Sequence, residues 1–186
     1  MKNLEAFMEL LCGHFDNQAQ YEQMKAEGKE FPFARHVNTA CNDKITNLPD
    51  DFAGIFMVEE SYYTTEKGTH ASPHLFLFTE EADGSVKLTS YDLPEGSKKD
   101  FTYDTFTTVD YNDLKPSAKF TPAVYVEKDG VWEGGSESMF TPVLKFSLFE
   151  RFSKECLEVS ESMELNGKRT FGYDDPILYV RIPEEA

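Results

Sequence analysis

Two adjacent carboxylates interrupt a strongly apolar stretch of the chain. Glu59 and Glu60 follow the run Gly54–Val58 and precede Tyr62 and Tyr63. Successive side chains of a strand point to opposite faces, so at least one carboxylate points toward a side whose neighbours are apolar. A buried acid needs a partner or a raised pKa, and both properties suit a ligand-binding site. The alternative is that both carboxylates lie at an exposed strand end and pair with lysine.

The histidines and cysteines do not have the spacing of a metal site. His70 and His74 are four residues apart, which directs two imidazoles to one metal ion only on a helix, and Pro73 argues against a helix there. The thiols share wide spacing and lack any Cys-x-x-Cys pair; they are Cys12, Cys41 and Cys156. We therefore predict no metal site and three reduced thiols, most of them buried as small hydrophobic residues.

Three consecutive strands are expected to position the carboxylates. Gly54–Tyr63, Pro73–Phe78 and Val86–Tyr91 are predicted to form an antiparallel meander. The polar segment Thr64–Ser72 is predicted as a flexible hairpin loop between the first two, and Asp83-Gly84 as the following turn. On the second strand, alternation places Leu75 and Leu77 on one face and His74, Phe76 and Phe78 on the other.

Further strands follow at the spacing of an antiparallel barrel. The expected segments are Phe33–Thr39, Phe101–Thr107, Phe120–Glu127, Val131–Ser136, Val143–Phe152, Cys156–Met163 and Ile177–Ile182. Leu4–Leu11 is predicted as a short amphipathic helix that plugs or flanks the sheet. The sequence thus predicts one mostly β domain over residues 1–186, an antiparallel barrel of about eight to ten strands with room for side chains or one small ligand.

The charge of the chain excludes several classes of partner. With 34 acidic and 18 basic residues, the formal charge is −16, so nucleic acid and anionic membrane surfaces are repelled. Acidic residues are spaced through Met1–Leu11, and no window reaches membrane-spanning length, which favours a cytoplasmic protein. No Ser-His-Asp order, phosphate-binding glycine loop or dinucleotide fingerprint is present.

Short motifs near the start of the chain resemble those of a known family. Gly13–Gln20 has the pattern Gly-x-Phe-x-Asn-x-x-Gln, Pro32–His36 has Pro-Phe-x-x-His, and Val58–Tyr62 is similar to Val-Glu-Gln-x-Tyr. These motifs, followed in compatible order by the later strands, resemble the CpcT/CpeT family of phycobiliprotein chromophore lyases. The resemblance extends over nearly the whole chain.

The resemblance implies a lipocalin-like β-barrel that holds a linear tetrapyrrole, or bilin, such as phycocyanobilin or phycoerythrobilin. The family helps attach the bilin through a thioether to a cysteine of a phycobiliprotein subunit, and fixing a flexible chromophore near that thiol gives an oriented encounter. By this resemblance, Glu59 and Tyr62 are the candidate catalytic residues, both expected to project into the pocket. Other candidate ligand contacts are Asn17, Gln20, His36, Glu60, His74, Phe76 and Tyr91. We expect a non-covalent bilin ligand, with a phycobiliprotein subunit and a second copy of this chain as candidate partners.

Departures from the family pattern keep other functions open. Leu75 and Leu77 stand where the family carries arginines suited to bilin propionates, and Ser117-Ala118 stands where Gly-Cys is expected. A non-catalytic lipocalin-like carrier or regulatory module for another elongated hydrophobic molecule is the second hypothesis. The third is an interaction module whose barrel is filled by Phe and Leu side chains, and a structure without a cavity would select it.

Overall fold

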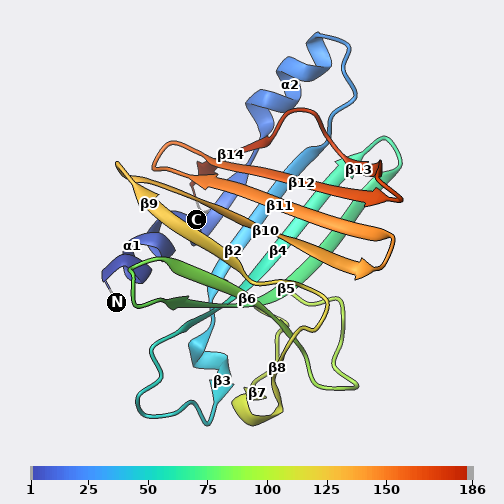
Figure 1. Ribbon diagram of the computed structural model, residues 1–186. Helices are drawn as coiled ribbons and strands as arrows, with labels where there is room; N and C mark the ends of the chain where they lie inside the picture. The colour runs from blue at the N-terminus through green and yellow to red at the C-terminus, as the bar shows by residue number, and fades with distance from the viewer. Residues whose placement is uncertain (1, 184–186) are drawn as a thin grey trace.

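Ten antiparallel strands close into a barrel in the computed structural model, which describes residues 2–183 (Figure 1). Around the barrel the order is β11, β10, β9, β6, β5, β4, β2, β1, β14 and β12, and β12 pairs with β11 to complete the circle. The strands are β1 (Gly13–Asp16), β2 (Phe33–Ala40), β4 (Ile55–Thr65), β5 (Gly68–Glu80), β6 (Val86–Asp92), β9 (Ala123–Lys128), β10 (Val131–Thr141), β11 (Leu144–Phe152), β12 (Leu157–Leu165) and β14 (Ile177–Ile182). The predicted antiparallel barrel with a short N-terminal helix is confirmed.

Short elements decorate this barrel. In the same sheet, β8 (Lys115–Pro116) pairs with β6 and β13 (Lys168–Gly172) pairs with β12. A separate parallel pair joins β3 (Ile45–Thr46) to β7 (Val109–Asp110). The helices are α1 (Lys2–Leu11), α2 (Gln18–Ala26) and the short 3-10 helices η1 (Asn42–Lys44) and η2 (Tyr111–Asp113).

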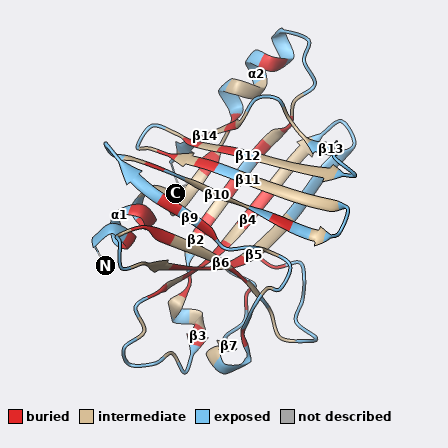
Figure 2. Cartoon of the chain, viewed as in Figure 1, coloured by how far each residue is buried: buried red, intermediate tan, exposed pale blue. Residues whose placement is uncertain are grey.

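One end of the barrel is closed by α1. This helix buries Leu4, Phe7, Met8 and Leu11 because they share one face at helical spacing. Phe7 has its ring centroid between 5.1 and 5.6 Å from four other buried aromatic rings, those of Phe78, Tyr125, Trp132 and Phe152. In Figure 1, α1 lies at the left, opposite the β10–β11 and β12–β13 turns at the right. The right-hand hairpins are mostly intermediate or exposed (Figure 2).

The outer face of β4 is also covered, which explains why this strand is apolar on both faces. Phe56 and Val58 point outward and pack against a cluster that includes Phe101, Phe106 and Leu114 from the segment between β6 and β8. The segment Phe101–Thr107, predicted as a strand or another extended segment, instead contains a turn at residues 103–105 and forms no strand. Phe101 and Phe106 lie on either side of this turn, and both pack into the outer cluster. The segment pairs with no strand.

The loop predicted at Thr64–Ser72 is also wrong. β4 and β5 continue to pair through Thr65↔Gly68, so only Glu66 and Lys67 form the turn. Gly68 has φ 116°, a left-handed conformation that glycine adopts without strain. Polar residues are compatible with paired strands here because this hairpin extends beyond the core into solvent.

Candidate functional site

A cavity of about 730 Å³ occupies the open half of the barrel. Its apolar wall includes Phe76, Leu88, Phe120, Phe140, Phe146 and Leu148. Polar side chains line it from β4, β5 and β12, namely Glu59, Ser61, Tyr63, Ser72, His74 and Glu161. The hypothesis of an interior solid with Phe and Leu is therefore wrong. The volume lies within the range of pockets that hold small molecules, roughly 300–1,000 Å³.

Glu59 is one of two carboxyl groups that line this cavity. Its side chain is 15% exposed, and no hydrogen-bond donor from residues 2–183 contacts its carboxyl group. Burial raises the pKa of Glu59 well above its usual value, and the nearby carboxyls of Glu150 and Glu161 raise it further. Both effects disfavour the charged carboxylate relative to the neutral acid.

His36 lies behind Glu59 on β2. Its Nδ1 is 3.9 Å from Oε2 of Glu59, a distance at which opposite charges would form an ion pair. Burial, followed by the proximity of His74, lowers the pKa of His36 to about 3, so the imidazole is neutral. The Nε2 atom of His36 is 3.1 Å from the Ser61 hydroxyl, and its ring stacks on Tyr179 at 4.1 Å. The contact between His36 and Glu59 is therefore not an ion pair, because the imidazole is uncharged.

Two more carboxyls lie on the inner face of the barrel. The Tyr125 hydroxyl donates a hydrogen bond to Glu150, and burial nevertheless raises the pKa of Glu150 to about 7. The Tyr63 hydroxyl donates to Oε2 of Glu161 at 3.1 Å, and burial also raises the pKa of Glu161. Each of these acids thus has a tyrosine donor, whereas Glu59 has none. Glu59 is left as the carboxyl group with free capacity for a ligand.

Four of the predicted site residues line the cavity or support it directly. Glu59, His74 and Phe76 line the cavity, with the rings of His74 and Phe76 stacked at 5.4 Å. The Nε2 atom of His74 is 3.1 Å from the Ser72 hydroxyl, and burial lowers the pKa of His74 to about 4. His36, through its contacts with Ser61 and Glu59, belongs to the shell behind them.

Tyr62 lies on the outer face of the barrel, so the expectation that it shares a pocket with Glu59 is wrong. The two residues are three positions apart on one strand, and alternation sends them to opposite faces. The Tyr62 hydroxyl donates to Glu60 at 2.6 Å, and the Tyr103 backbone N–H donates to the same carboxylate at 2.9 Å. Burial, followed by the hydrogen bond to Glu60, raises the pKa of Tyr62 to about 12. Glu60 thus fastens the outer covering segment.

Tyr91 also lies outside the cavity, contrary to its assignment as a ligand contact. Its ring packs edge-on against Phe56 in the outer cluster at 5.3 Å. Side chains alternate between the two faces of β6, and the one that this strand contributes to the cavity is that of Leu88.

Asn17 and Gln20 hold α2 to the barrel rather than lining the cavity. Asn17 accepts a hydrogen bond from the Ala34 backbone N–H at 2.8 Å and donates to the Pro32 carbonyl at 3.1 Å. Gln20 donates to the Pro176 carbonyl at 2.8 Å and accepts from the Leu178 backbone N–H at 2.9 Å. Their polar atoms satisfy backbone groups at strand ends, so the spacing of the motif is explained by the fold.

The site also contains residues that were not selected from the sequence. Glu161, Tyr63, Phe120, Phe140 and Phe146 all line the cavity. The alternation of Val143–Phe152 already placed Phe146 on the same face as Leu148 and Glu150. The closure that brings Glu161 beside Tyr63 leaves no such local signal, because the two residues are 98 positions apart.

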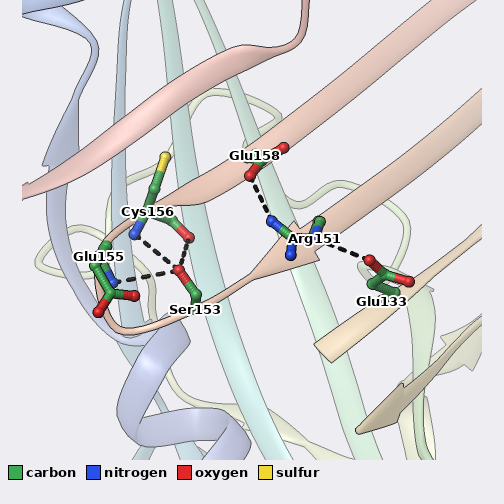
Figure 3. A network of polar contacts seen from close by, with 6 residues as sticks. All are labelled: Glu133, Arg151, Ser153, Glu155, Cys156 and Glu158. Carbon is green, nitrogen blue, oxygen red and sulfur yellow. Dashed lines mark hydrogen bonds and ion pairs between the residues drawn. The ribbon is translucent and has the colours of Figure 1, made fainter. Parts of the chain in front are cut away.

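None of the cysteines lines the cavity. Burial raises the pKa of Cys41 to about 12 and that of Cys156 to about 11, and it also raises the pKa of Cys12. Cys156 lies in the turn between β11 and β12, where its backbone N–H donates to the Ser153 hydroxyl (Figure 3). Raised pKa values disfavour the nucleophilic thiolate. A ligand in the cavity therefore has no thiol of this chain within reach.

Within residues 2–183, no group of three or more His, Cys, Asp or Glu side chains is arranged to hold a metal ion. None of the described helices is long and apolar enough to cross a membrane.

No family model matches the chain, and neither the curated proteins nor the solved structures include one similar to it. The fold and the site define a closed antiparallel β-barrel, consistent with a lipocalin-like barrel, that has a ligand-sized cavity.

Proposed function

We propose that this protein binds a linear tetrapyrrole in the barrel cavity and assists its thioether attachment to a cysteine of a phycobiliprotein subunit. The observation that carries the proposal is Glu59, a buried acid without a hydrogen-bond donor in a cavity of about 730 Å³ with an aromatic wall. A conjugated bilin presents flat rings to aromatic side chains and N–H groups to a carboxylate. The aromatic wall and the carboxyl group of Glu59 face the same cavity.

The raised pKa of Glu59 gives it a specific role toward such a ligand. A neutral carboxylic acid can transfer its proton to a basic ring nitrogen of the bilin. The resulting carboxylate then pairs with the cationic N–H groups, in a site whose low polarity strengthens the pair. Tyr63, which points inward beside Glu161, supplies the ring contact that the resemblance assigned to Tyr62.

The location of the thiols is consistent with delivery to another chain. Attachment forms a carbon–sulfur bond when a thiolate adds to an exocyclic double bond of the bilin, and a proton then reaches the chromophore. The thiolate comes from the phycobiliprotein subunit in this proposal, because Cys12, Cys41 and Cys156 do not line the cavity. The open end of the barrel is the side from which a partner would approach.

The alternative is a non-catalytic carrier of a bilin or another elongated hydrophobic molecule. One observation favours it: Tyr62, half of the catalytic pair implied by the resemblance, is on the outer face. The missing arginines are weaker support for the carrier. Leu75 and Leu77, which stand in their place, point outward into the covered cluster and not into the cavity.

Titration with phycocyanobilin tests the binding step. Binding is expected to sharpen the long-wavelength absorption band, and Glu59→Gln is expected to weaken binding about tenfold through loss of a charge-assisted contact. Glu60→Gln, one position away on the outer face, is the matched control and should keep the spectrum. Ser136→Phe, which projects a large ring into the cavity from β10, should weaken the change.

An unchanged spectrum at about 50 µM bilin would reject the proposal, as would equal effects of the Glu59 and Glu60 variants. Adding an apo-phycobiliprotein subunit then separates the two functions. Chromophore that stays with the subunit after denaturing electrophoresis indicates a lyase, whereas binding without transfer indicates a carrier.

A further inference from the structure

The charged residues that line the cavity are separated by depth. Among the described residues, its carboxyls are Glu59 and Glu161, which lie inside the barrel on β4 and β12. Its lysines are Lys67, in the turn between β4 and β5, and Lys119, just before β9, and both are exposed. The mouth therefore carries cations and the interior carries acids.

This arrangement departs from the average surface of the protein. The chain has 34 acidic and 18 basic residues, yet no exposed carboxylate of residues 2–183 lines the cavity mouth. Glu66 precedes Lys67 in the hairpin turn but does not line the cavity. A mouth that carries only positive charge attracts anions in an otherwise strongly anionic molecule.

Lys119 is held in place over the wall of the cavity. Its Nζ atom is 4.0 Å from the ring centroid of Phe140 and 5.2 Å from that of Phe120, and both rings line the cavity. Neither Lys119 nor Lys67 forms an ion pair with a carboxylate of the described residues, in contrast to Lys145, which pairs with Glu137 and Glu164 on the outer face. The ammonium group of Lys119 is thus positioned over aromatic rings and remains available to an anion.

A second pocket has its lysines accompanied by carboxylates. Lys98 and Lys99 line a pocket of about 460 Å³ on the outside of β5 and β6, together with Asp92 and Glu95. Equal numbers of lysine and carboxylate side chains line this pocket. This pocket therefore lacks the excess of positive charge found at the mouth of the barrel cavity.

We propose that the natural ligand carries carboxylate or other anionic groups at the end that faces the mouth, where Lys67 and Lys119 bind them, while its N–H donors face Glu59. This inference rests on the proposed function. It narrows the ligands to those that carry anionic groups at one end and N–H donors farther along the molecule. A neutral hydrocarbon or a ligand with a single cationic end does not satisfy it.

Two fluorescent dyes with nearly the same aromatic body test the inference without a bilin. Anilinonaphthalene sulfonate is anionic, and N-phenylnaphthylamine lacks the sulfonate. The Lys67→Ser/Lys119→Ser variant is expected to bind the anionic dye about fivefold more weakly and the neutral dye unchanged. Lys25→Ser/Lys128→Ser is the control, because it removes the same charge from exposed lysines that do not line the cavity.

The variant Ser136→Phe identifies the dye that is bound inside the barrel. An unchanged affinity of the double lysine variant for the anionic dye would overturn the inference, and so would an equal loss for both dyes or for the control variant. The proposed function is decided separately by the phycocyanobilin titration of Glu59→Gln. Phycocyanobilin and its dimethyl ester give the same comparison for the natural class of ligand, with the ester expected to be insensitive to the two lysines.

Discussion

The two ends of the barrel use the same residue type for different purposes. At the closed end, Phe7 from α1 is fully buried among four aromatic rings that approach it from different strands. At the open end, Phe120, Phe140 and Phe146 contact one another on one side and leave a cavity on the other. Phenylalanine thus contributes to stability at the first end and shapes a binding surface at the second.

A layer of carboxyls lies between the two ends. Glu150, bonded to Tyr125, lies next to the aromatic core, and Glu59 and Glu161 line the cavity. The helix α1 fills one end of the barrel, and the carboxyl layer lies above it. The barrel is thus divided into an end that stabilises the fold and an end that can bind a ligand. The following substitutions test that division.

The largest effect is expected for Phe7→Ala at the closed end. Phe7 is fully buried, and its removal leaves a void among rings that cannot collapse freely, so the free energy of unfolding should fall by about 3–5 kcal/mol. At the open end, the Phe146 side chain already faces the cavity. The substitution Phe146→Ala should therefore lower the free energy of unfolding by less than about 1 kcal/mol. Denaturant unfolding of both variants measures the difference, and equal losses would contradict the division of the barrel.

An intermediate, pH-dependent effect is expected for Glu150→Gln. Because the folded-state pKa of Glu150 is raised to about 7 from 4.5, its contribution to stability is complete below pH 4.5 and is lost as the pH rises through 7. The variant removes this loss, so its stability relative to the unsubstituted protein should increase by about 2 kcal/mol between pH 5 and pH 8. Urea unfolding at a series of pH values measures this, and a pH-independent difference would show that Glu150 does not titrate.

His74, the half-buried histidine that lines the cavity, should behave in the opposite sense. The pKa of His74 is lowered to about 4 from 6.5, so its contribution to stability is present above pH 6.5 and is lost as the pH falls through 4. His74→Gln should therefore gain stability relative to the unsubstituted protein on acidification, which makes it a control of opposite sign for Glu150→Gln.

The smallest effect is expected on the outer face of the closed end. Arg151, next to the inward-pointing Phe152, bonds to Glu133 at 2.8 Å and to Glu158 at 2.9 Å (Figure 3). Exposed ion pairs lose most of their energy to solvent and to side-chain ordering. Arg151→Ala should leave the unfolding midpoint within the scatter of repeated titrations, and a large shift would show that this network contributes to the closed end.

The strand pattern made most of the fold predictable. The meander of β4, β5 and β6, the hairpin of β9 and β10 and the plugging helix α1 all follow from local alternation or helical spacing. The segment Phe101–Thr107 was misassigned because its aromatic residues are buried by a distant cluster, which overrides local strand propensity.

The site was only partly predictable for the same reason. Alternation alone separates Glu59 from Tyr62, but the motif similarity of Val58–Tyr62 grouped them, and the structure shows that only Glu59 enters the cavity. The motif residues Asn17 and Gln20 also prove to satisfy backbone groups. The partners of Glu150 and Glu161 depend on barrel closure, which joins residues far apart in the sequence.

The plugging helix has a consequence for how the molecule can be made. Phe7 lies near the start of the chain, whereas Tyr125, Trp132 and Phe152 lie in its last third. Such sequence-distant contacts slow folding and leave apolar surface uncovered during synthesis. A growing chain can pack α1 against Phe78 of β5 early, but it cannot complete the burial of Phe7 until the ribosome has released β9, β10 and β11.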